Sequence, residues 1–231
     1  MTQHLMGGNA TIIVTYSADE SQANLWTKCG SPAGVVTVVC TINAGVLLYG
    51  GNTTTGSLKV PTGFAVGSNI TINNLGSIYG RGGDGGTGGA TPSGGGDPGN
   101  KGGIALQIFR NVSVSNASGE IFAGGNGGAG GSAGPAWSGG GGGGGQGKGD
   151  SSGGAWGTAF PVGLHSDAGH TGNVADRGAV GAAAGDASAG KIGKVWGGYA
   201  TGSPPQAVDL NANTVTWIDG NDSVHVKGAQ S

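Results

Sequence analysis

The chain has 231 residues, of which 57 are glycine, and its formal net charge is −2. Glycine makes up about 7% of an average protein, and each glycine inside a helix costs about 1 kcal/mol relative to alanine, so the composition excludes a mainly helical protein. The chain has no basic excess for binding nucleic acid, and it contains no run of about 18 apolar residues that would predict a membrane-spanning helix.

The first 79 residues predict short β-strands. Runs of β-branched residues bounded by glycine and asparagine are typical of strands in a small sheet or sandwich. The expected strands are residues 11–16, 35–42, 46–49, 69–72 and 77–79. The polar residues 19–26, which lie between the first two strands, are compatible with one helical turn.

A unit of strand, asparagine turn, strand and glycine run occurs twice in the chain. The first copy occupies residues 69–89, and the second copy, about 42 residues further on, occupies residues 111–131. Residues 41–51 echo the unit upstream, and residues 213–218 repeat only its first strand. A repeat of about 20–50 residues indicates a stacked architecture, although two full and two partial copies are fewer than a regular solenoid would show.

Both glycine runs, residues 82–89 and 124–131, read Gly-Gly-X with a period of three. This period fits neither a helix, with about 3.6 residues per turn, nor the two-residue alternation of a strand, but it fits the extended left-handed helix with three residues per turn. That helix has no internal hydrogen bonds, and its glycine faces let neighbouring backbones approach and pair with each other. The runs therefore predict a bundle of polyglycine II-type helices. The alternative is a flexible linker, because chains rich in glycine and serine usually behave as random coils.

Together these patterns predict an all-β protein with almost no α-helix, in which β repeats feed the Gly-Gly-X arms of a polyglycine II-type helix bundle. We divide the chain into three expected domains. Residues 1–79 are a β-rich N-terminal domain for attachment or assembly, residues 80–203 are the glycine-rich bundle with a β insert at 104–122, and residues 204–231 are a C-terminal β segment.

Short inserts interrupt the bundle region and carry its aromatic side chains. A packed bundle must turn at its ends, so we expect these inserts to be end loops, and loops on a rigid scaffold commonly carry recognition. Tryptophan and tyrosine are also the preferred anchors of binding surfaces. The candidate binding residues are Trp137, Trp156, Phe160, His165, His170, Trp196 and Tyr199. The alternative is that these side chains cover a bundle that has no side-chain core of its own.

The sequence predicts no enzyme, no cofactor and no metal site. His165, Asp167 and His170 have a spacing that resembles a set of metal ligands, but the chain offers no evident further ligand to complete the set. A Gly-x-Gly-x-x-Gly string that begins at Gly80 matches a dinucleotide-binding loop. Such matches arise by chance in a chain this rich in glycine, and no long helix follows the string.

The two cysteines, Cys29 and Cys40, flank a predicted turn and strand. Two cysteines cannot staple a chain of this length. They would form a disulfide if neighbouring strands brought them together, and they are equally compatible with buried free thiols.

Where β repeats lead into Gly-Gly-X arms with aromatic loops, the sequence resembles the glycine-rich receptor-binding adhesins of tailed bacteriophages, in particular the long-tail-fibre tip adhesins of T-even-like phages. Residues 72–86 and 121–128 carry the resemblance, which extends over residues 70–203. It implies a bundle of packed polyglycine helices whose end loops contact a host outer-membrane protein or surface glycan. It also implies attachment to other virion fibre proteins through the N-terminal region. Residues 1–60 depart from the family pattern, which leaves the position in the virion open among tail-fibre tip, tail spike and head fibre.

The leading hypothesis is therefore a non-enzymatic virion adhesin of the tail fibre or head fibre. We expect it to be made in the host cytoplasm, because residues 1–8 lack the charged start and apolar stretch of a signal peptide. A homotrimer is an open expectation by analogy with fibre proteins. The second hypothesis is a structural virion protein, such as a decoration, collar or fibre component. A more distant alternative is an ice-binding protein, since some antifreeze proteins use Gly-Gly-X helices.

Overall fold

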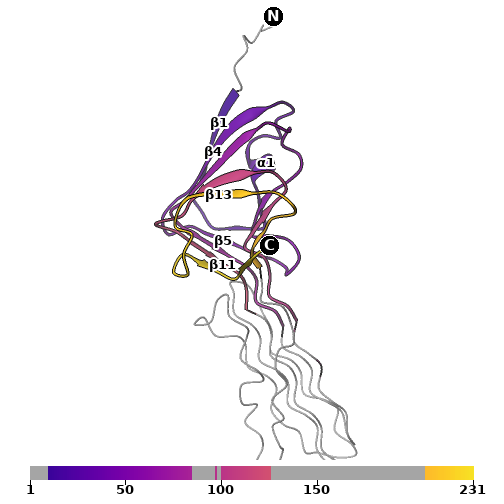
Figure 1. The fold of residues 1–231 in the computed structure, drawn as a ribbon, viewed down its shortest axis with the longest axis vertical. Coiled ribbons are helices and arrows are strands. Elements are labelled where there is room, and N and C mark those ends of the chain that lie inside the picture. Colours follow the sequence, from indigo (N-terminus) through magenta and orange to yellow (C-terminus); the bar gives the residue numbers. More distant parts are fainter. Residues whose placement is uncertain (1–9, 85–96, 98–99, 126–205) are drawn as a thin grey trace, which may run out of the picture.

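The computed structural model describes residues 10–84, 97, 100–125 and 206–231. Within these residues the strands form three five-stranded sheets in which neighbouring strands run parallel. Neighbours in every sheet differ by three in chain order, so the chain passes once through each sheet before it returns to the first. The fold is therefore a parallel β-helix of five stacked coils with three strands in each coil (Figure 1).

We name the three sheets A, B and C. Sheet A contains β1 (Ala10–Tyr16), β4 (Val36–Ile42), β7 (Asn69–Asn74), β10 (Val112–Ser115) and β13 (Val215–Asp219). Sheet B contains β2 (Glu20–Ser21), β5 (Leu47–Tyr49), β8 (Ser77–Tyr79), β11 (Glu120–Phe122) and β14 (Val226–Lys227). Sheet C contains β3 (Ala23–Asn24), β6 (Leu58–Val60), β9 (Leu106–Ile108), β12 (Gln206–Asp209) and β15 (Ala229–Gln230). A single helical turn, α1 (Leu25–Lys28), is the only helix in this part of the chain, which confirms the all-β prediction.

In β4, β7 and β10 the core of the β-helix is built from alternate residues. Buried and partly exposed side chains alternate along β4, as the two-residue period of a strand requires. Stacking then places like residues over one another: Leu48, Ile78, Ile121 and Val226 occupy matching positions in four neighbouring strands of sheet B. All four are buried. Full burial of a side chain of this kind contributes about 1.5–3 kcal/mol, so these interior columns are the main source of stability.

The predicted 42-residue repeat corresponds to two neighbouring coils. In the register of β7 and β10, Thr71 lies beside Ser113. At the turn that follows these strands, Asn74 Nδ2 donates a hydrogen bond to Asn116 Oδ1 at 2.7 Å, and both side chains are buried. Because a buried amide needs a hydrogen-bond partner, each asparagine depends on the other. The prediction of stacked repeats is confirmed.

Two expectations about the architecture are wrong. The strands wind into a parallel coil rather than a small sheet or sandwich, and the five coils exceed the number that the repeats indicated. Alternation of apolar and polar residues in the sequence predicts which face of a strand is buried, but it does not predict which strand lies beside it. In addition, the third strand of every coil has only two to four residues, which is too short to give a sequence signal.

The expected helical turn over residues 19–26 is also wrong over most of its length. Residues 20–24 hold β2 and β3, which are separated by Gln22 with a φ of 51°. The helix α1 starts at Leu25 instead, and Asn24 Oδ1 caps it by accepting a hydrogen bond from Thr27 N at 3.2 Å. β2 and β3 are edge strands that pair with β5 and β6 of the second coil. The polar composition of this region therefore does not predict a helix.

Strands from all three expected segments of the chain belong to the same sheets. β7, β10 and β13 come from residues 1–79, 80–203 and 204–231 respectively, and they lie side by side in sheet A. The first and fifth coils form the two ends of the stack, with β1 and β13 outermost in sheet A (Figure 1). Over the described ranges, the chain forms no helix long and apolar enough to cross a membrane.

Candidate functional site

The coils differ most in the connection between their second and third strands. A single residue, Gln22 or Gly228, makes this connection in the first and fifth coils. In the second, third and fourth coils it consists of residues 50–57, 80–105 and 123–205. We call residues 80–105 the first arm, residues 123–205 the second arm, and the edge from which they leave the arm corner. We call the described ends of the arms, residues 80–84, 100–105 and 123–125, the arm roots. Stacked strands lie about 4.8 Å apart, so the arm roots leave the β-helix next to one another (Figure 1).

The two arms leave the arm corner as neighbouring, hydrogen-bonded chains. Gly80 N donates to Phe122 O at 2.8 Å, and Gly83 N donates to Gly125 O at 2.9 Å. The two bonds are three residues apart on both chains, which is the period of an extended three-residue helix and differs from the two-residue period of a strand. A helix of this kind has no internal hydrogen bonds, so its backbone groups need partners on a neighbouring chain.

The returning end of the first arm packs against both outgoing ends. Gly103 N donates to Arg81 O at 2.7 Å, and Asn100 N donates to Asp84 O at 2.8 Å, again with a spacing of three residues. Gly124 N donates to Gly103 O at 2.9 Å. Each of the three roots is therefore hydrogen-bonded to both of the others, so the backbones form a compact cluster rather than a flat ladder.

No side chain fits between these three backbones. A Cβ atom at Gly80 would overlap with Gly103 O, and a Cβ atom at Gly124 would overlap with Arg81 O. The side chains that are present point elsewhere: Arg81 Nη2 forms an ion pair with Asp84 Oδ1 at 3.1 Å. Residues three apart share a face of a three-residue helix, so the ion pair lies on one face of the root and the glycines lie on the packed faces.

An aromatic stack marks the point where the arms begin. Tyr79 and Phe122, the last residues of β8 and β11, stack with ring centroids 5.4 Å apart and an interplanar angle of 16°. Lys227 Nζ lies 4.6 Å from the centroid of Phe122, and the Tyr79 hydroxyl donates to the carboxylate of Glu120. Aromatic and cation–π contacts of this geometry are each worth about 0.5–1.5 kcal/mol beyond burial. The stack thereby fixes the two chains immediately before their first glycines.

The fifth coil holds the turn that leads into β11. Asp219 Oδ1 accepts hydrogen bonds from Asn116 N at 2.6 Å and from Ala117 N at 2.8 Å, and Ser115 Oγ donates to the same carboxylate at 3.0 Å. The N–H groups of Ala117 and Asn116 lower the pKa of Asp219, because they stabilise the charged carboxylate.

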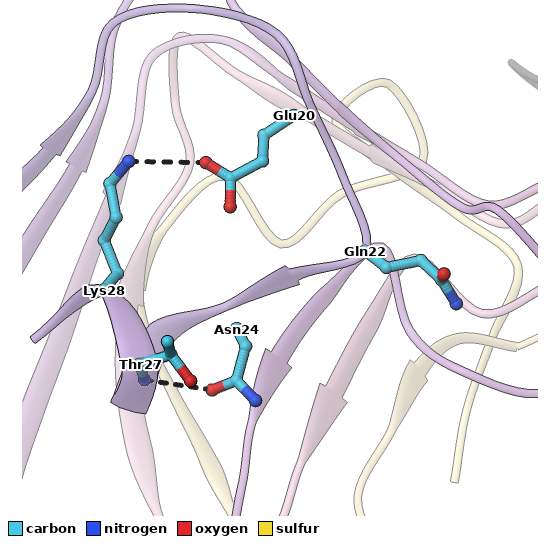
Figure 2. A pocket seen from close by; sticks show the side chains of 5 residues that line it. All are labelled: Glu20, Gln22, Asn24, Thr27 and Lys28. Atoms are coloured by element: carbon cyan, nitrogen blue, oxygen red, sulfur yellow. Dashed lines mark hydrogen bonds and ion pairs between the residues drawn. The ribbon is translucent and has the colours of Figure 1, made fainter. Parts of the chain in front are cut away.

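A polar depression of about 380 Å³ lies at the first coil (Figure 2). Its lining residues are Glu20, Gln22, Asn24, Thr27 and Lys28. Lys28 Nζ pairs with Glu20 Oε2 at 3.3 Å, and Asn24 accepts from Thr27 N (Figure 2). The charged groups of the depression neutralise each other, so their arrangement indicates a surface feature of the β-helix rather than a site for chemistry.

Three titratable groups lie close to α1. Cys29 and Cys40 are free, so the free-thiol alternative holds in this structure. Burial raises the pKa of Cys40 to about 12 and also raises the pKa of Cys29, which keeps both thiols protonated and poorly nucleophilic. Burial likewise raises the pKa of Tyr16, whose ring lies 4.8 Å from Lys28 Nζ.

The candidate binding residues predicted from the sequence, from Trp137 to Tyr199, lie outside the described residues and stay predictions. Trp26 and Trp217, in contrast, pack against the hydrophobic core. Within the described ranges, no group of three or more histidine, cysteine, aspartate or glutamate side chains could hold a metal ion.

Sequence reasoning missed the residues that hold the arm roots. It treats Tyr79 and Phe122 only as strand residues, and it assigns no role to Asp219 or Lys227. A signal for the first two exists, because both copies of the repeat place an aromatic residue just before the glycine run. No such signal exists for Asp219, whose partner Asn116 lies 103 residues earlier in the chain.

Comparison with known proteins identifies a family and a fold. A family model described as phage tail fibre adhesin Gp38 matches residues 9–230. Among solved structures, the chain is similar to one described as the crystal structure of the gp37-gp38 adhesin tip complex of the bacteriophage S16 long tail fiber, with a TM-score of 0.51 and 20% sequence identity over 96% of this chain and 82% of that chain. At this identity the similarity concerns the fold. The chain matches no curated protein.

Proposed function

The chain belongs to the phage tail fibre adhesin Gp38 family, and we propose that it binds a host cell-surface receptor through loops at the ends of its glycine-rich arms. Family membership makes it a receptor-binding structural protein of a phage tail fibre, located in the virion. Membership in an adhesin family also favours a non-enzymatic protein, in line with the sequence prediction. Beyond family membership, the proposal specifies which part of the chain contacts the host.

The arms form a polyglycine II-type bundle in this proposal. The observation that carries it is the set of hydrogen bonds between the arm roots, which recur every three residues on each chain. The lack of room for a Cβ atom at Gly80 and Gly124 supports the same packing. Such a bundle would hold its end loops in fixed positions, and fixed loops lose less conformational entropy on binding than mobile loops do.

The residues that contact the receptor are the aromatic and histidine side chains of the inserts. The residues proposed are Trp137, Trp156, Phe160, His165, His170, Trp196 and Tyr199. Large aromatic side chains supply most of the binding energy at many protein interfaces and also stack on sugars, so the partner is a host outer-membrane protein or a surface glycan.

The N-terminal region attaches the adhesin to another fibre protein. The similar solved structure is a complex of gp37 with gp38, and by analogy this chain has a fibre partner. In support, β1 is the outermost strand of sheet A, its sequence contains no charged residue, and Ile13 on it is 74% exposed. An uncharged edge strand of this length readily pairs with a further strand.

Alanine substitution of Trp137, Trp156 and Trp196 tests the proposal. We expect host-cell adsorption to fall at least about tenfold, since loss of one anchor residue commonly costs more than 1 kcal/mol. Incorporation into fibres should equal that of the parent. The control is Val66→Ala, which truncates a side chain that is 82% exposed on the β-helix. Parental adsorption by correctly assembled triple-variant fibres would contradict the proposal and leave a purely structural fibre component.

A further inference from the structure

The second arm lies between two strands of the fourth coil. It begins after β11, which ends at Phe122, and it returns into β12, which begins at Gln206. On one side these two strands pair with the third coil. On the other side they pair with β14 and β15 of the fifth coil, which comprises residues 215–230. The last residues of the chain therefore pair with the strand before the second arm and with the strand after it.

The fifth coil contacts the outgoing root directly. Ile121 N donates to His225 O at 2.8 Å, and Ala123 N, within the second arm itself, donates to Lys227 O at 2.9 Å. The Lys227 ammonium also covers the ring of Phe122. These contacts fix the backbone on both sides of Phe122, where the strand changes into the glycine-rich arm.

Asp219 fastens the fifth coil to the fourth. Its carboxylate accepts hydrogen bonds from the backbone N–H groups of Asn116 and Ala117 and from the hydroxyl of Ser115, at the turn that joins β10 to β11. Hydrogen bonds to a charged group are roughly twice as strong as neutral ones. From the other direction, Asn116 Nδ2 lies 3.3 Å from Gly220 O and 3.2 Å from His225 O, so the buried side chain of Asn116 is also satisfied by the fifth coil.

The fit between the two coils is close at the same place. Gly220 adopts a φ of +66°, and a Cβ atom there would overlap with the backbone of Asn116. Left-handed backbone and lack of space both require glycine at this position. The fifth coil therefore contacts the turn through close steric fit at Gly220 as well as through the charged hydrogen bonds of Asp219.

We propose that the fifth coil is a clasp that sets the orientation of the second arm, with Asp219 as a positioning residue for receptor binding. This inference rests on the proposed function, because it concerns how the receptor-binding arm is held. Asp219 itself lies on the β-helix and contacts the turn at residues 115–117. It acts on the arm through the turn, β11 and the backbone bond to Ala123.

The variant Asp219→Ala tests the clasp, with Ile218→Ala as the matched control, because Ile218 is the adjacent residue and is 58% exposed. Hydrogen exchange of single amides is the first measurement. We expect the amides of Ile121 and Ala123 to exchange at least about tenfold faster in Asp219→Ala, while the amides of β4 keep their protection. Tenfold in exchange corresponds to about 1.4 kcal/mol.

Host-cell adsorption is the second measurement, and it should fall in Asp219→Ala and stay at the parental level in Ile218→Ala. The variant Asp219→Asn retains an acceptor oxygen, so we expect it to recover part of both effects. Equal acceleration of β4 and β11 amides would overturn the proposal, because it would show a general loss of stability. Unchanged exchange at Ile121 and Ala123 would overturn it as well.

The exchange measurement also separates this proposal from the proposed function. If the tryptophan variants adsorb normally but Ile121 and Ala123 lose protection in Asp219→Ala, the clasp holds and the receptor assignment fails. If Asp219→Ala does not fold, Lys227→Gln provides a milder break of a second contact between the fifth coil and the outgoing root, since it removes only the charge over Phe122. Loss of protection at Ala123 in this variant supports the clasp, and full protection contradicts it.

Discussion

The β-helix and the arm roots exclude empty space in opposite ways, the first by packing side chains and the second by packing backbones. In the β-helix, columns of large side chains such as Ile78 and Ile121 fill the space between sheets and are fully buried. At the arm roots the backbones themselves are the packed surface, and a single methyl group at Gly80 or Gly124 would have no room. The effect of a substitution therefore reverses within a few residues of the chain: removing atoms destabilises the coils, and adding atoms destabilises the roots.

The change from one mode of packing to the other takes place at the aromatic stack of Tyr79 and Phe122. Each ring belongs to the last residue of a strand, and the next residues of its chain belong to an arm. A stacked pair is wide and rigid, so it can hold two backbones at a defined separation before the glycine-rich packing begins.

The largest effect is expected from Ile121→Ala, which removes atoms from a fully buried column of sheet B. Truncation of a buried isoleucine costs about 2–5 kcal/mol. For a chain of this size each 1 kcal/mol lowers Tm by about 2–4 °C, which thermal unfolding will detect. The exposed control Ile218→Ala should change Tm little. A loss below about 1 kcal/mol for Ile121→Ala would show that side-chain columns do not dominate the stability of the β-helix.

A smaller loss is expected from Gly124→Ala, which adds one methyl group between the arm roots. Because the new Cβ atom overlaps with Arg81 O, we expect a cost of about 1–3 kcal/mol, the usual range for overpacking. Denaturant unfolding and amide exchange at Gly103 and Gly124 will measure it. The matched control is Gly34→Ala, where no atom lies within 4 Å of the new Cβ atom. If the two variants behave alike, the roots are not packed through their backbones.

Acid should weaken the fifth coil before the other coils. The N–H groups of Ala117 and Asn116 lower the pKa of Asp219, and hydrogen bonds from His225 lower the pKa of Asp222. A carboxyl group whose pKa is lower in the folded state adds stability above its unfolded pKa of about 3.9, and this stability is lost as pH falls through the folded pKa. We therefore expect the stability of the parent to decrease below about pH 4, as measured by denaturant unfolding across pH.

The variant with both Asp219→Asn and Asp222→Asn is the control for the acid effect. It has lost both titrating groups, so its stability should fall less steeply over the same range of pH. An equally steep decrease in the parent and in this variant would assign the acid sensitivity to other carboxylates. Amide exchange at Ile121, which reports on contact with the fifth coil, will localise the effect.

The smallest effect is expected from Lys28→Met at the polar depression. The ion pair with Glu20 has side chains that are 38% and 39% exposed, and exposed pairs contribute about 0–1 kcal/mol. The thermal midpoint should move by no more than about 2–4 °C. A larger decrease would mean that the contact of Lys28 with the ring of Tyr16 stabilises the first coil more than the ion pair does.

The sequence predicts some parts of this fold because their signals are local. The β-branched runs that form β1 and β4 alternate inward and outward residues, and the paired asparagines Asn74 and Asn116 mark two coils that stack in register. The three-residue spacing of hydrogen bonds at the roots agrees with the Gly-Gly-X period, while most of both predicted runs lies outside the described residues. In the strands, the local alternation of residues determines which side chains are buried.

The rest depends on contacts between residues far apart in the chain. The parallel coil arises from pairings such as β10 with β13, whose residues lie about a hundred positions apart, and no short pattern encodes such a partner. For the same reason the role of Asp219 could not be read from the sequence. The proposed receptor-binding residues, such as Trp137 and Trp196, lie beyond the described ranges, so they remain predictions that rest on residue type and on the family.

Removal of the second arm tests the central claim most directly. Replacing residues 126–203 by a short glycine turn leaves all five coils and the described roots in the chain. We predict that this variant unfolds cooperatively, joins the fibre and no longer adsorbs to host cells. Adsorption at the parental level by fibres that contain the shortened chain would contradict the account, because receptor binding would then reside in the β-helix or in another fibre protein.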